Sequence, residues 1–332
     1  MSERAPVLLI PLLILGLVSC AVAGLMIGPV DLSLSRVFSG LFGTGDENIT
    51  IIIRELRLPR VAIGILAGAT LGISGAALQG LLRNPLADPG VIGVSASAGL
   101  GAVIAISFGL VSIFLMAVQL LAMAGGLVAT SILLYLAARD ASIMTLILAG
   151  IGLSSLAAAL MALVMNFAPN PLALQDMVMW LMGSLQNRTS EDLVLTLPFV
   201  LAGWLLLIGT GRGLDATSLG EETATTLGIN MKFLRLRIIL GAAVSVGAVV
   251  AVCGTVGFVG LVIPHFLRPF VGYAPGRLLL PSALGGAILL LLADMITRVP
   301  FGSHQLQLGV VTSLIGAPLF LHIIYKTREV MR

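Results

Sequence analysis

The side chains most often used in catalysis and metal binding are scarce and scattered in this sequence. The three histidines, His265, His304 and His322, lie in different segments, and none has an acidic residue three or four positions away. A protein metal site needs several ligands at closer spacing. Neither of the two lysines, Lys232 and Lys326, follows a glycine as the lysine of a phosphate-binding loop does. We therefore expect neither a bound metal nor ATP hydrolysis by this chain.

A single carboxylate stands clearly inside an apolar segment. Asp294 lies four residues before Arg298, so on a helix the two side chains share one face and we expect them to pair. Proton-coupled carriers place ionisable groups at mid-membrane, whereas Asp294 lies near the end of its segment, which disfavours secondary transport. The sequence contains no cluster of nucleophile, base and metal ligands of the kind that a membrane enzyme needs. It also contains no repeated filter and no ring of charge, which are the usual signs of a channel.

One short polar segment carries the signals of a capped helix. Ser218 and Glu221 have the spacing of a capping box, in which a hydroxyl and a carboxylate accept hydrogen bonds from backbone amides at a helix start. Gly228 supplies a left-handed helix end. The spacing predicts a helix over 219–227, as either a plain surface helix or a docking element.

The amino-acid composition is that of a membrane protein. Hydrophobic residues make up 58% of the 332 positions and charged residues 10%, with a mean hydropathy of +1.12. Soluble domains carry about 25% charged residues, so a soluble globular protein and a nucleic-acid binder are both excluded. Cys20 and Cys253 lie in apolar runs, which excludes a disulfide framework. The 39 glycines predict close packing between helices.

Apolar runs of the length needed to span a bilayer, about 20 residues, recur along the chain. We predict an all-α polytopic bundle of about ten transmembrane helices, forming one domain over 1–332. The eighth span is short and holds Pro264, so we expect it to be tilted, broken or only partly inserted. The predicted spans are 6–28, 58–82, 91–109, 112–136, 142–166, 193–211, 236–254, 255–270, 278–297 and 305–325.

The distribution of lysine and arginine predicts the orientation, because cytoplasmic loops carry the excess. With the N-terminus inside, twelve fall in the cytoplasm and six outside, and an even number of spans returns the C-terminus to the cytoplasm. Spans two to five then enter from outside and spans seven to ten from inside, as an inverted repeat requires. The outer six are Arg36, Arg54, Arg57, Arg60, Arg188 and Arg298.

Several motifs, in order along the chain, resemble the FecCD-type permeases, the membrane subunits of ABC importers for iron-siderophores, haem and cobalamin. The resemblance covers about residues 55–325. It rests on Arg57-Leu58-Pro59-Arg60, Gly75-Ala76-Ala77-Leu78-Gln79-Gly80, Arg83-Asn84-Pro85-Leu86-Ala87-Asp88-Pro89-Gly90, Trp180-Leu181-Met182-Gly183-Ser184-Leu185, Gly257-Phe258-Val259-Gly260-Leu261-Val262-Ile263-Pro264-His265 and Gly316-Ala317-Pro318.

The resemblance implies a type II ABC importer permease in the bacterial inner membrane. Two copies would form a homodimer around the path, with two cytoplasmic ATP-binding subunits and an outer substrate-binding protein as partners. The permease itself would bind no cofactor, since ATP and Mg²⁺ belong to the partner ATPase. The cargo it implies is a metal chelate, an iron-siderophore or haem, with cobalamin as the alternative.

The resemblance also implies roles for particular residues. Arg57, Arg60 and Arg298 match positions that present arginines to glutamates of the binding protein, although snorkelling at helix ends explains arginines there as well. The cytoplasmic segment 215–230 matches the ATPase-coupling region of the family. Its implied coupling residues are Ser218, Leu219, Gly220, Glu221, Ala224, Leu227 and Gly228.

Two further groups are implied for the path. Asn84, Leu86 and Ser142 match the region that closes it to the cytoplasm, although Arg139-Asp140-Ala141 before Ser142 departs from the family form. The fifth span offers a weakly polar surface that would line the path, and helix packing explains the same residues equally well. These residues are Met144, Ser154, Ser155, Met161, Met165 and Asn166.

The last span begins with a departure from the family. Gln305-Leu306-Gln307-Leu308-Gly309 stands where Glu-Leu-Pro-Val-Gly is common, so the missing proline allows an extra helical turn and the missing carboxylate changes the mouth of the path. This departure therefore bears most on the identity of the substrate, which the resemblance does not determine. Two other classes stay open: a carrier or channel acting without an ATPase, and a structural membrane anchor.

Overall fold

The computed structural model describes residues 5–139, 143–299 and 305–330, and every regular element in them is a helix. Each of the ten predicted apolar segments overlaps one main helix, and the all-α polytopic prediction is confirmed. These helices are α1 (Ala5–Met26), α4 (Leu58–Leu81), α5 (Val94–Ser107), α6 (Ala117–Ala138), α7 (Ile143–Asn166), α9 (Ser190–Leu207), α12 (Met231–Cys253), α13 (Val259–Leu267), α14 (Pro275–Thr297) and α15 (Leu308–Val330).

Shorter helices occupy the predicted loops. The segment before α4 is helical from Glu47, so Arg57 and Arg60 lie within one continuous helix rather than at its start. The segment 167–192, between the predicted spans 142–166 and 193–211, contains the helix α8. The shorter elements are α2 (Leu34–Phe42), α3 (Glu47–Ile51), η1 (Ile52–Arg57), η2 (Pro89–Ile92), η3 (Leu110–Ser112), α8 (Pro171–Leu181), α10 (Gly211–Thr217), α11 (Glu221–Thr226) and η4 (Arg268–Val271).

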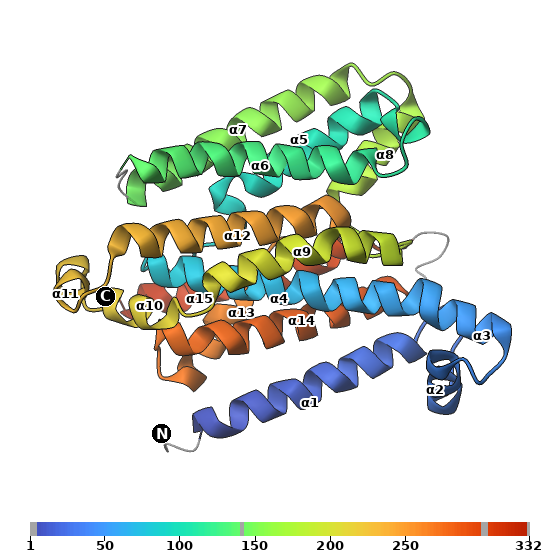
Figure 1. Ribbon diagram of the computed structural model, residues 1–332, viewed down its shortest axis with the longest axis horizontal. Helices are drawn as coiled ribbons and strands as arrows, with labels where there is room; N and C mark the ends of the chain where they lie inside the picture. The colour runs from blue at the N-terminus through green and yellow to red at the C-terminus, as the bar shows by residue number, and fades with distance from the viewer. Residues whose placement is uncertain (1–4, 140–142, 300–304, 331–332) are drawn as a thin grey trace.

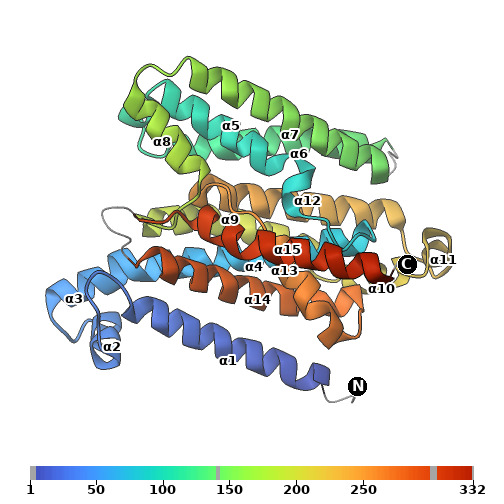
Figure 2. The ribbon, with the colours of Figure 1, turned by 180° about the vertical axis from the view of Figure 1, so that it is seen from behind.

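The centre of the bundle is formed by α4 and α12, whose residues are mostly buried (Figure 1). Helix α14 packs along α4 at very close range: a Cβ on Gly72 would lie 2.0 Å from the carbonyl oxygen of Ser282, and one on Gly286 would lie 2.2 Å from that of Gly68. Such contacts require small residues, as expected from the glycine content. Helices α1 and α7 lie at opposite edges of the bundle (Figures 1 and 2).

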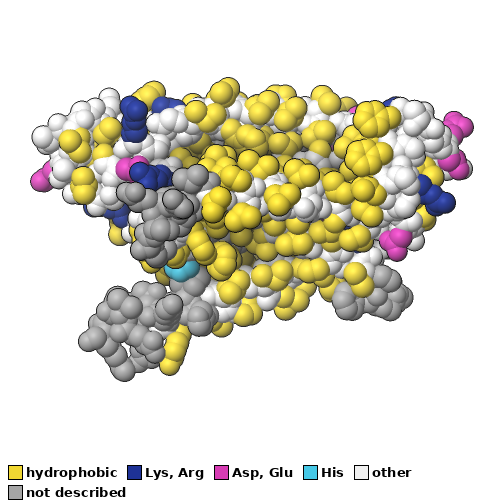
Figure 3. Space-filling view, turned by 90° about the horizontal axis from the view of Figure 1, so that it is seen from below, with side chains coloured by type: hydrophobic (Ala, Val, Ile, Leu, Met, Phe, Trp, Pro, Cys, Tyr) yellow, Lys and Arg dark blue, Asp and Glu magenta, His cyan; other side chains and the backbone are white. Residues whose placement is uncertain are grey.

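The face of the bundle seen in Figure 3 is apolar along its length, and the charged residues visible there gather at the two ends. By length and composition, 7 helices of the described chain can cross a membrane, while the helices Val94–Ser107, Val259–Val271 and Leu308–Leu321 are apolar but shorter. The eighth segment is short, because α13 continues directly into η4 and the combined helix covers only Val259–Val271. Whether it is tilted, broken or only partly inserted in the membrane stays a prediction.

The two ends of the bundle carry different elements (Figure 1). The start of α1, the end of α15 and helices α10 and α11 lie at one end, here called the α11 end. Helices α2 and α3 lie at the other, here called the α3 end. Both ends of the described chain therefore share a side with α11, as the predicted topology requires; which side faces the cytoplasm stays a prediction, as does the inverted repeat.

The extra helical turn that the missing proline allows before the last span is not formed. Residues Gln305 to Gln307 are not helical and α15 begins at Leu308. The backbone amides of Leu308 and Gly309 donate instead to the carbonyls of Gly183 and Met182, at 3.0 and 2.9 Å. These tertiary hydrogen bonds to the segment after α8 thus set the start of α15 at Leu308, although no proline precedes it.

Candidate docking and coupling sites

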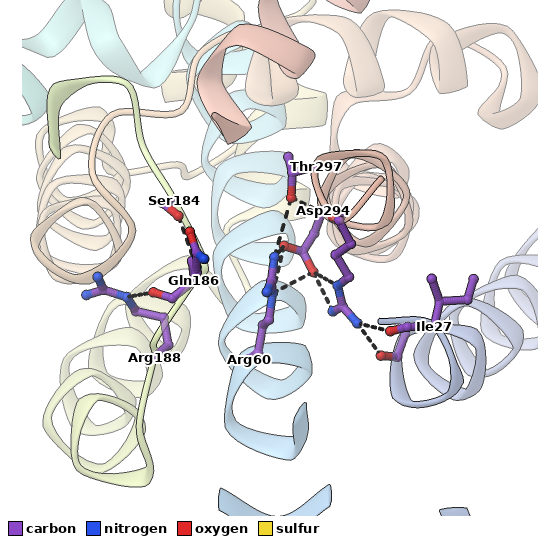
Figure 4. A network of polar contacts seen from close by, with 9 residues as sticks. Ile27, Arg60, Ser184, Gln186, Arg188, Asp294 and Thr297 are labelled. Atoms are coloured by element: carbon purple, nitrogen blue, oxygen red, sulfur yellow. Dashed lines mark hydrogen bonds and ion pairs between the residues drawn. The ribbon is translucent and has the colours of Figure 1, made fainter. Parts of the chain in front are cut away.

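A buried carboxylate organises the α3 end. The Asp294 side chain is 1% exposed and accepts hydrogen bonds from two arginines, Arg60 and Arg298 (Figure 4). We call these three residues the Asp294 network. Arg60 of α4 donates from Nε to both carboxylate oxygens, at 3.0 and 3.1 Å, and from Nη2 to Oδ1 at 2.8 Å. Arg298 donates from Nε and Nη2 to Oδ2, at 3.0 and 2.5 Å. The predicted pair of Asp294 with Arg298 is confirmed, and Arg60 is an additional partner.

Two arginines also hold the end of α1. Arg298 donates from Nη1 to the carbonyls of Gly24 and Ile27. Arg57, only 6% exposed, donates from Nη1 to the carbonyls of Leu25 and Met26, and from Nη2 to that of Val30. The last carbonyls of a helix have no partner within the helix, so these guanidinium groups complete α1 and fix the chain that follows it.

Beside these groups the surface is hollowed into a cavity of about 410 Å³. Its walls include Arg57, Arg60 and Arg298 together with Glu55 and Arg188. Arg188 lies on the segment between α8 and α9, where it donates to the carbonyls of Gln186 and Val252, and its guanidinium points away from Arg60 (Figure 4). The cavity is therefore rich in positive charge.

The three predicted docking arginines do meet at one cavity, but they are not free. Each one already donates to Asp294 or to backbone carbonyls, and Arg298 and Arg57 have almost fully buried side chains. The expectation that all three project toward a partner therefore needs correction, because the contacts within the chain engage two of them fully. Their docking role itself stays a prediction.

At the α11 end, the predicted helix over 219–227 is present as the shorter helix α11 (Glu221–Thr226), and a separate helix, α10, precedes it. Helix α10 ends at Thr217 and α11 begins at Glu221, with Gly220 between them at φ +106°. The predicted capping box is wrong: the Ser218 hydroxyl donates back to the carbonyl of Asp215 at 2.6 Å. Gly220 is the residue that precedes α11, and it has no side chain to cap with. The predicted left-handed end at Gly228 is confirmed, with φ +84°.

Polar contacts tie this helix pair to two long helices. Glu221 accepts from Arg235 of α12 at 2.6 Å, which gives its carboxylate a different partner from the one predicted. Asp215 accepts from the backbone amide of Gly276 at 2.8 Å, so a negative charge faces the first turn of α14. The helix pair is therefore joined to both α12 and α14.

Apolar side chains on this helix pair are divided between core and surface. Ala224 is fully buried, whereas Leu219 and Leu227 are 65% and 61% exposed at the tip of the α11 end. Two exposed leucines beside a buried alanine form a small apolar surface on a fixed base. Such a surface is suited to contact with a partner protein.

The predicted gate residues lie on the connection from α4 to η2. Asn84 is exposed and accepts from the amide of Leu86 at 2.9 Å, which makes a tight turn that leaves Leu86 37% exposed. Asp88 follows and accepts from the amide of Gly90 at 2.8 Å, and burial raises the pKa of its carboxyl group. Ser142, the third gate residue, lies outside the described residues. The gate role stays a prediction.

The predicted path residues lie on α7, at the edge of the bundle. Met144, Ser155 and Asn166 are exposed, whereas Ser154, Met161 and Met165 are partly buried against the neighbouring helices. Around Gly152 there is open space, since a Cβ added to this glycine would meet no atom within 4 Å. The helix thus presents a long face that the described chain does not cover, and the lining role stays a prediction.

A groove of about 640 Å³ lies between the end of α8, the segment that precedes α13, and α15, and the sequence did not predict it. Leu181, Thr255, Gly309 and Ser313 are among its lining residues. Three non-helical segments meet here, because the amide of Ser184 donates to the carbonyl of Cys253 and the first amides of α15 donate to the same segment after α8. Irregular backbone at membrane depth occurs where it is buried in protein or lines a cavity. The glycines at positions 183, 254 and 257 are the sequence signal that could have indicated it.

The architecture defines a class of protein. A bundle with apolar sides, an arginine-lined cavity at one end and an exposed helix pair fixed to core helices at the other is typical of the membrane subunit of a transporter built from several proteins. The family follows from comparison: residues 12–326 match the FecCD transport family, and the chain belongs to it. It is an ABC importer permease, a multi-pass protein whose family implies ATPase and substrate-binding partners.

Relatives with different cargoes are similar over most of their length. The hemin transport system permease HmuU of Yersinia pestis is 36% identical, covering 96% of this chain and 97% of its own. The vitamin B12 import permease BtuC of Escherichia coli O9:H4 is 39% identical over 84% of this chain and 85% of its own. A solved inward-facing structure of a putative metal-chelate type ABC transporter has a TM-score of 0.84 and 34% identity, covering 96% of this chain and 98% of its own.

Proposed function

We propose that this permease passes a metal chelate, an iron-siderophore or haem, from a substrate-binding protein into the cytoplasm when partner subunits hydrolyse ATP. The observation that carries this proposal is the match to a hemin permease over nearly the whole of both chains. The chelate-type solved structure supports it independently at the level of the fold. Cobalamin is the alternative cargo, and the similarity to vitamin B12 permeases favours it.

This permease would itself discriminate only weakly between cargoes, because few polar side chains line its groove. The groove between the end of α8, the segment that precedes α13, and α15 is lined mainly by apolar side chains, with Thr255 and Ser313 as its hydroxyl groups. Such a surface lets a large chelate slide without holding it, so the choice of chelate would fall to the binding protein. The exposed Met144 of α7 would act in the same way.

The helix pair α10 and α11 would transmit the ATPase motion. Leu219 and Leu227 would enter a cleft on the ATP-binding subunit, because they are the exposed apolar groups of this pair. Closure of that subunit would push the pair, and the Glu221–Arg235 and Asp215–Gly276 contacts would carry the displacement to α12 and α14. Rigid-body movement of this kind needs a stiff connection between lever and core.

Two copies of the chain would enclose the path, with the uncovered face of α7 turned toward it. Two ATP-binding subunits would then dock at the α11 end, and one binding protein would cover the α3 end. The predicted cytoplasmic termini agree with this arrangement, since both described ends of the chain lie at the α11 end (Figure 1).

Transport in proteoliposomes tests the proposal. Permease, its ATPase and its binding protein are reconstituted together, and accumulation of haem, a ferric siderophore and cobalamin is measured with ATP or with a non-hydrolysable analogue. We expect uptake of an iron chelate only when all three proteins and hydrolysable ATP are present. Uptake without the ATPase would establish the carrier class instead, and uptake of cobalamin alone would establish the alternative cargo.

A further inference from the structure

Helix α2 carries more apolar surface than its own chain covers. The sequence Leu34–Phe42 places apolar residues on one half of the helix, and two serines and Arg36 on the other. Val37 and Gly40 are buried, and a Cβ on Gly40 would lie 2.9 Å from the side chain of Ile53. One part of the apolar half therefore packs closely on η1.

The other part of that apolar half is left largely open by the described chain. Leu34, Phe38 and Phe42 follow one another at steps of four residues, so they lie along one side of the helix, here called the α2 stripe. Their exposed fractions are 46%, 50% and 74%. A contiguous row of exposed apolar side chains of this size marks contact with another apolar surface.

The position of α2 places this stripe where the hydrocarbon layer ends. Helix α1 has 22 residues, which is about 33 Å and enough to cross the hydrocarbon layer of about 30 Å. The chain turns directly after it, because the amide of Leu32 donates to the carbonyl of Met26 at 3.1 Å. Helix α2 then runs across the direction of α1 (Figures 1 and 2). It therefore lies along the plane of the membrane at the level of the lipid headgroups.

The surface next to the α2 stripe is that of a helix facing lipid. Only 11% of the most apolar window of α1 is buried, and α1 contains no charged residue. Figure 3 looks onto the outer side of α1 and α2, where apolar side chains continue as far as the charged residues of the α3 end. Helix α7, which the proposed homodimer would turn toward its axis, lies at the opposite edge of the bundle (Figure 1). Lipid thus borders α2, whereas a second copy would not reach it.

We propose that α2 is an interfacial anchor, whose stripe enters the bilayer leaflet at the α3 end while Arg36 faces water. An amphipathic helix of this kind buries its apolar face about 5–10 Å into the boundary between headgroups and acyl chains. The anchor would also steady η1, because Arg54 of η1 donates from Nε and Nη2 to the carbonyl of Leu41, at 3.1 and 2.8 Å. This inference goes beyond the proposed function, since it holds whichever cargo the permease carries.

Spin-label accessibility in nanodiscs of phosphatidylethanolamine and phosphatidylglycerol tests the proposal. The full-length permease carries one label at a time, at Phe38→Cys or Phe42→Cys in the stripe, with Cys20 replaced by Ser and the buried Cys253 retained. Arg36→Cys is the matched control, because it is an exposed position on the polar half of the same helix. Collisions with oxygen, which concentrates in lipid, and with a water-soluble nickel chelate are measured by electron paramagnetic resonance. The thermal unfolding midpoint shows which variants are folded.

We expect the labels at positions 38 and 42 to favour oxygen over the nickel chelate by at least about threefold, and the label at position 36 to show the reverse. Equal access of the nickel chelate to positions 42 and 36 would overturn the inference, because the stripe would then lie in water. Protection of position 42 from both reagents would also overturn it. Such protection in the permease alone would indicate a second copy, and protection only after the binding protein is added would indicate that protein. If the position 38 variant does not fold, the comparison of positions 42 and 36 decides.

Discussion

At the scale of single residues, the most constrained group is a buried carboxylate with two cations. Asp294 on α14 binds Arg60 on α4 and Arg298 at its own helix end, and Arg298 also reaches α1. One carboxylate therefore joins three helices at the α3 end. Such a network is strongly destabilised when one charge is removed, because the remaining charges stay buried without compensation.

Replacement of the carboxylate by an amide measures this dependence. Asp294→Asn keeps the size of the side chain but leaves two guanidinium groups without their counter-charge, so we expect a loss of about 3–5 kcal/mol in the free energy of unfolding. Thermal or denaturant unfolding in detergent gives the value. Glu55→Gln is the control, since Glu55 is an exposed carboxylate at the same end and should change stability little. Equal stability of the two variants would contradict a structural role for the network.

At the scale of elements, the helix pair α10 and α11 shows how a lever can be fixed without the predicted cap. The lever is held by contacts to other helices, from Glu221 to Arg235 and from Asp215 to Gly276, rather than by its own terminal side chains. Its exposed leucines are then available to a partner. Stability and coupling are thus carried by different residues of the same element.

This separation predicts a variant that is folded but uncoupled. Leu227→Ser removes an exposed apolar contact at the α11 end, so we expect an unchanged unfolding midpoint together with a loss of at least about tenfold in binding-protein-stimulated ATPase activity. Leu115→Ser is the matched control, because Leu115 is 75% exposed in the connection between α5 and α6. Full stimulation of the Leu227 variant would show that the ATPase is contacted elsewhere.

At the scale of the whole molecule, the described chain covers two long helices poorly, α1 and α7, each of which has only 11% of its most apolar window buried. Helix α7 packs on α5, leaves most of its length uncovered and contains Gly152 and Ser155 on exposed positions. Small residues on an uncovered helix allow a second backbone to approach closely. This is the face that the proposed homodimer would turn toward its two-fold axis.

Cysteine crosslinking tests this arrangement in native membranes. Ser155→Cys, with Cys20 replaced by Ser and the buried Cys253 retained, should give a crosslinked dimer with a short bifunctional reagent. Val194→Cys on α9 is the control, because it is 70% exposed on a different helix and should give at most a trace of dimer. A dimer from the Val194 variant and none from the Ser155 variant would move the axis away from α7.

The sequence by itself determined the all-α membrane architecture, the family, the Asp294–Arg298 pair and the left-handed end at Gly228. These depend on local composition, helical spacing and backbone conformation, which a few neighbouring residues dictate. Only the tertiary structure decided that Arg60 joins Asp294, that Ser218 and Glu221 form no capping box, and that α15 starts at Leu308. In each case the outcome depends on how the chain packs around the residue, and nothing in the spacing of the local residues identifies the partner that it finds.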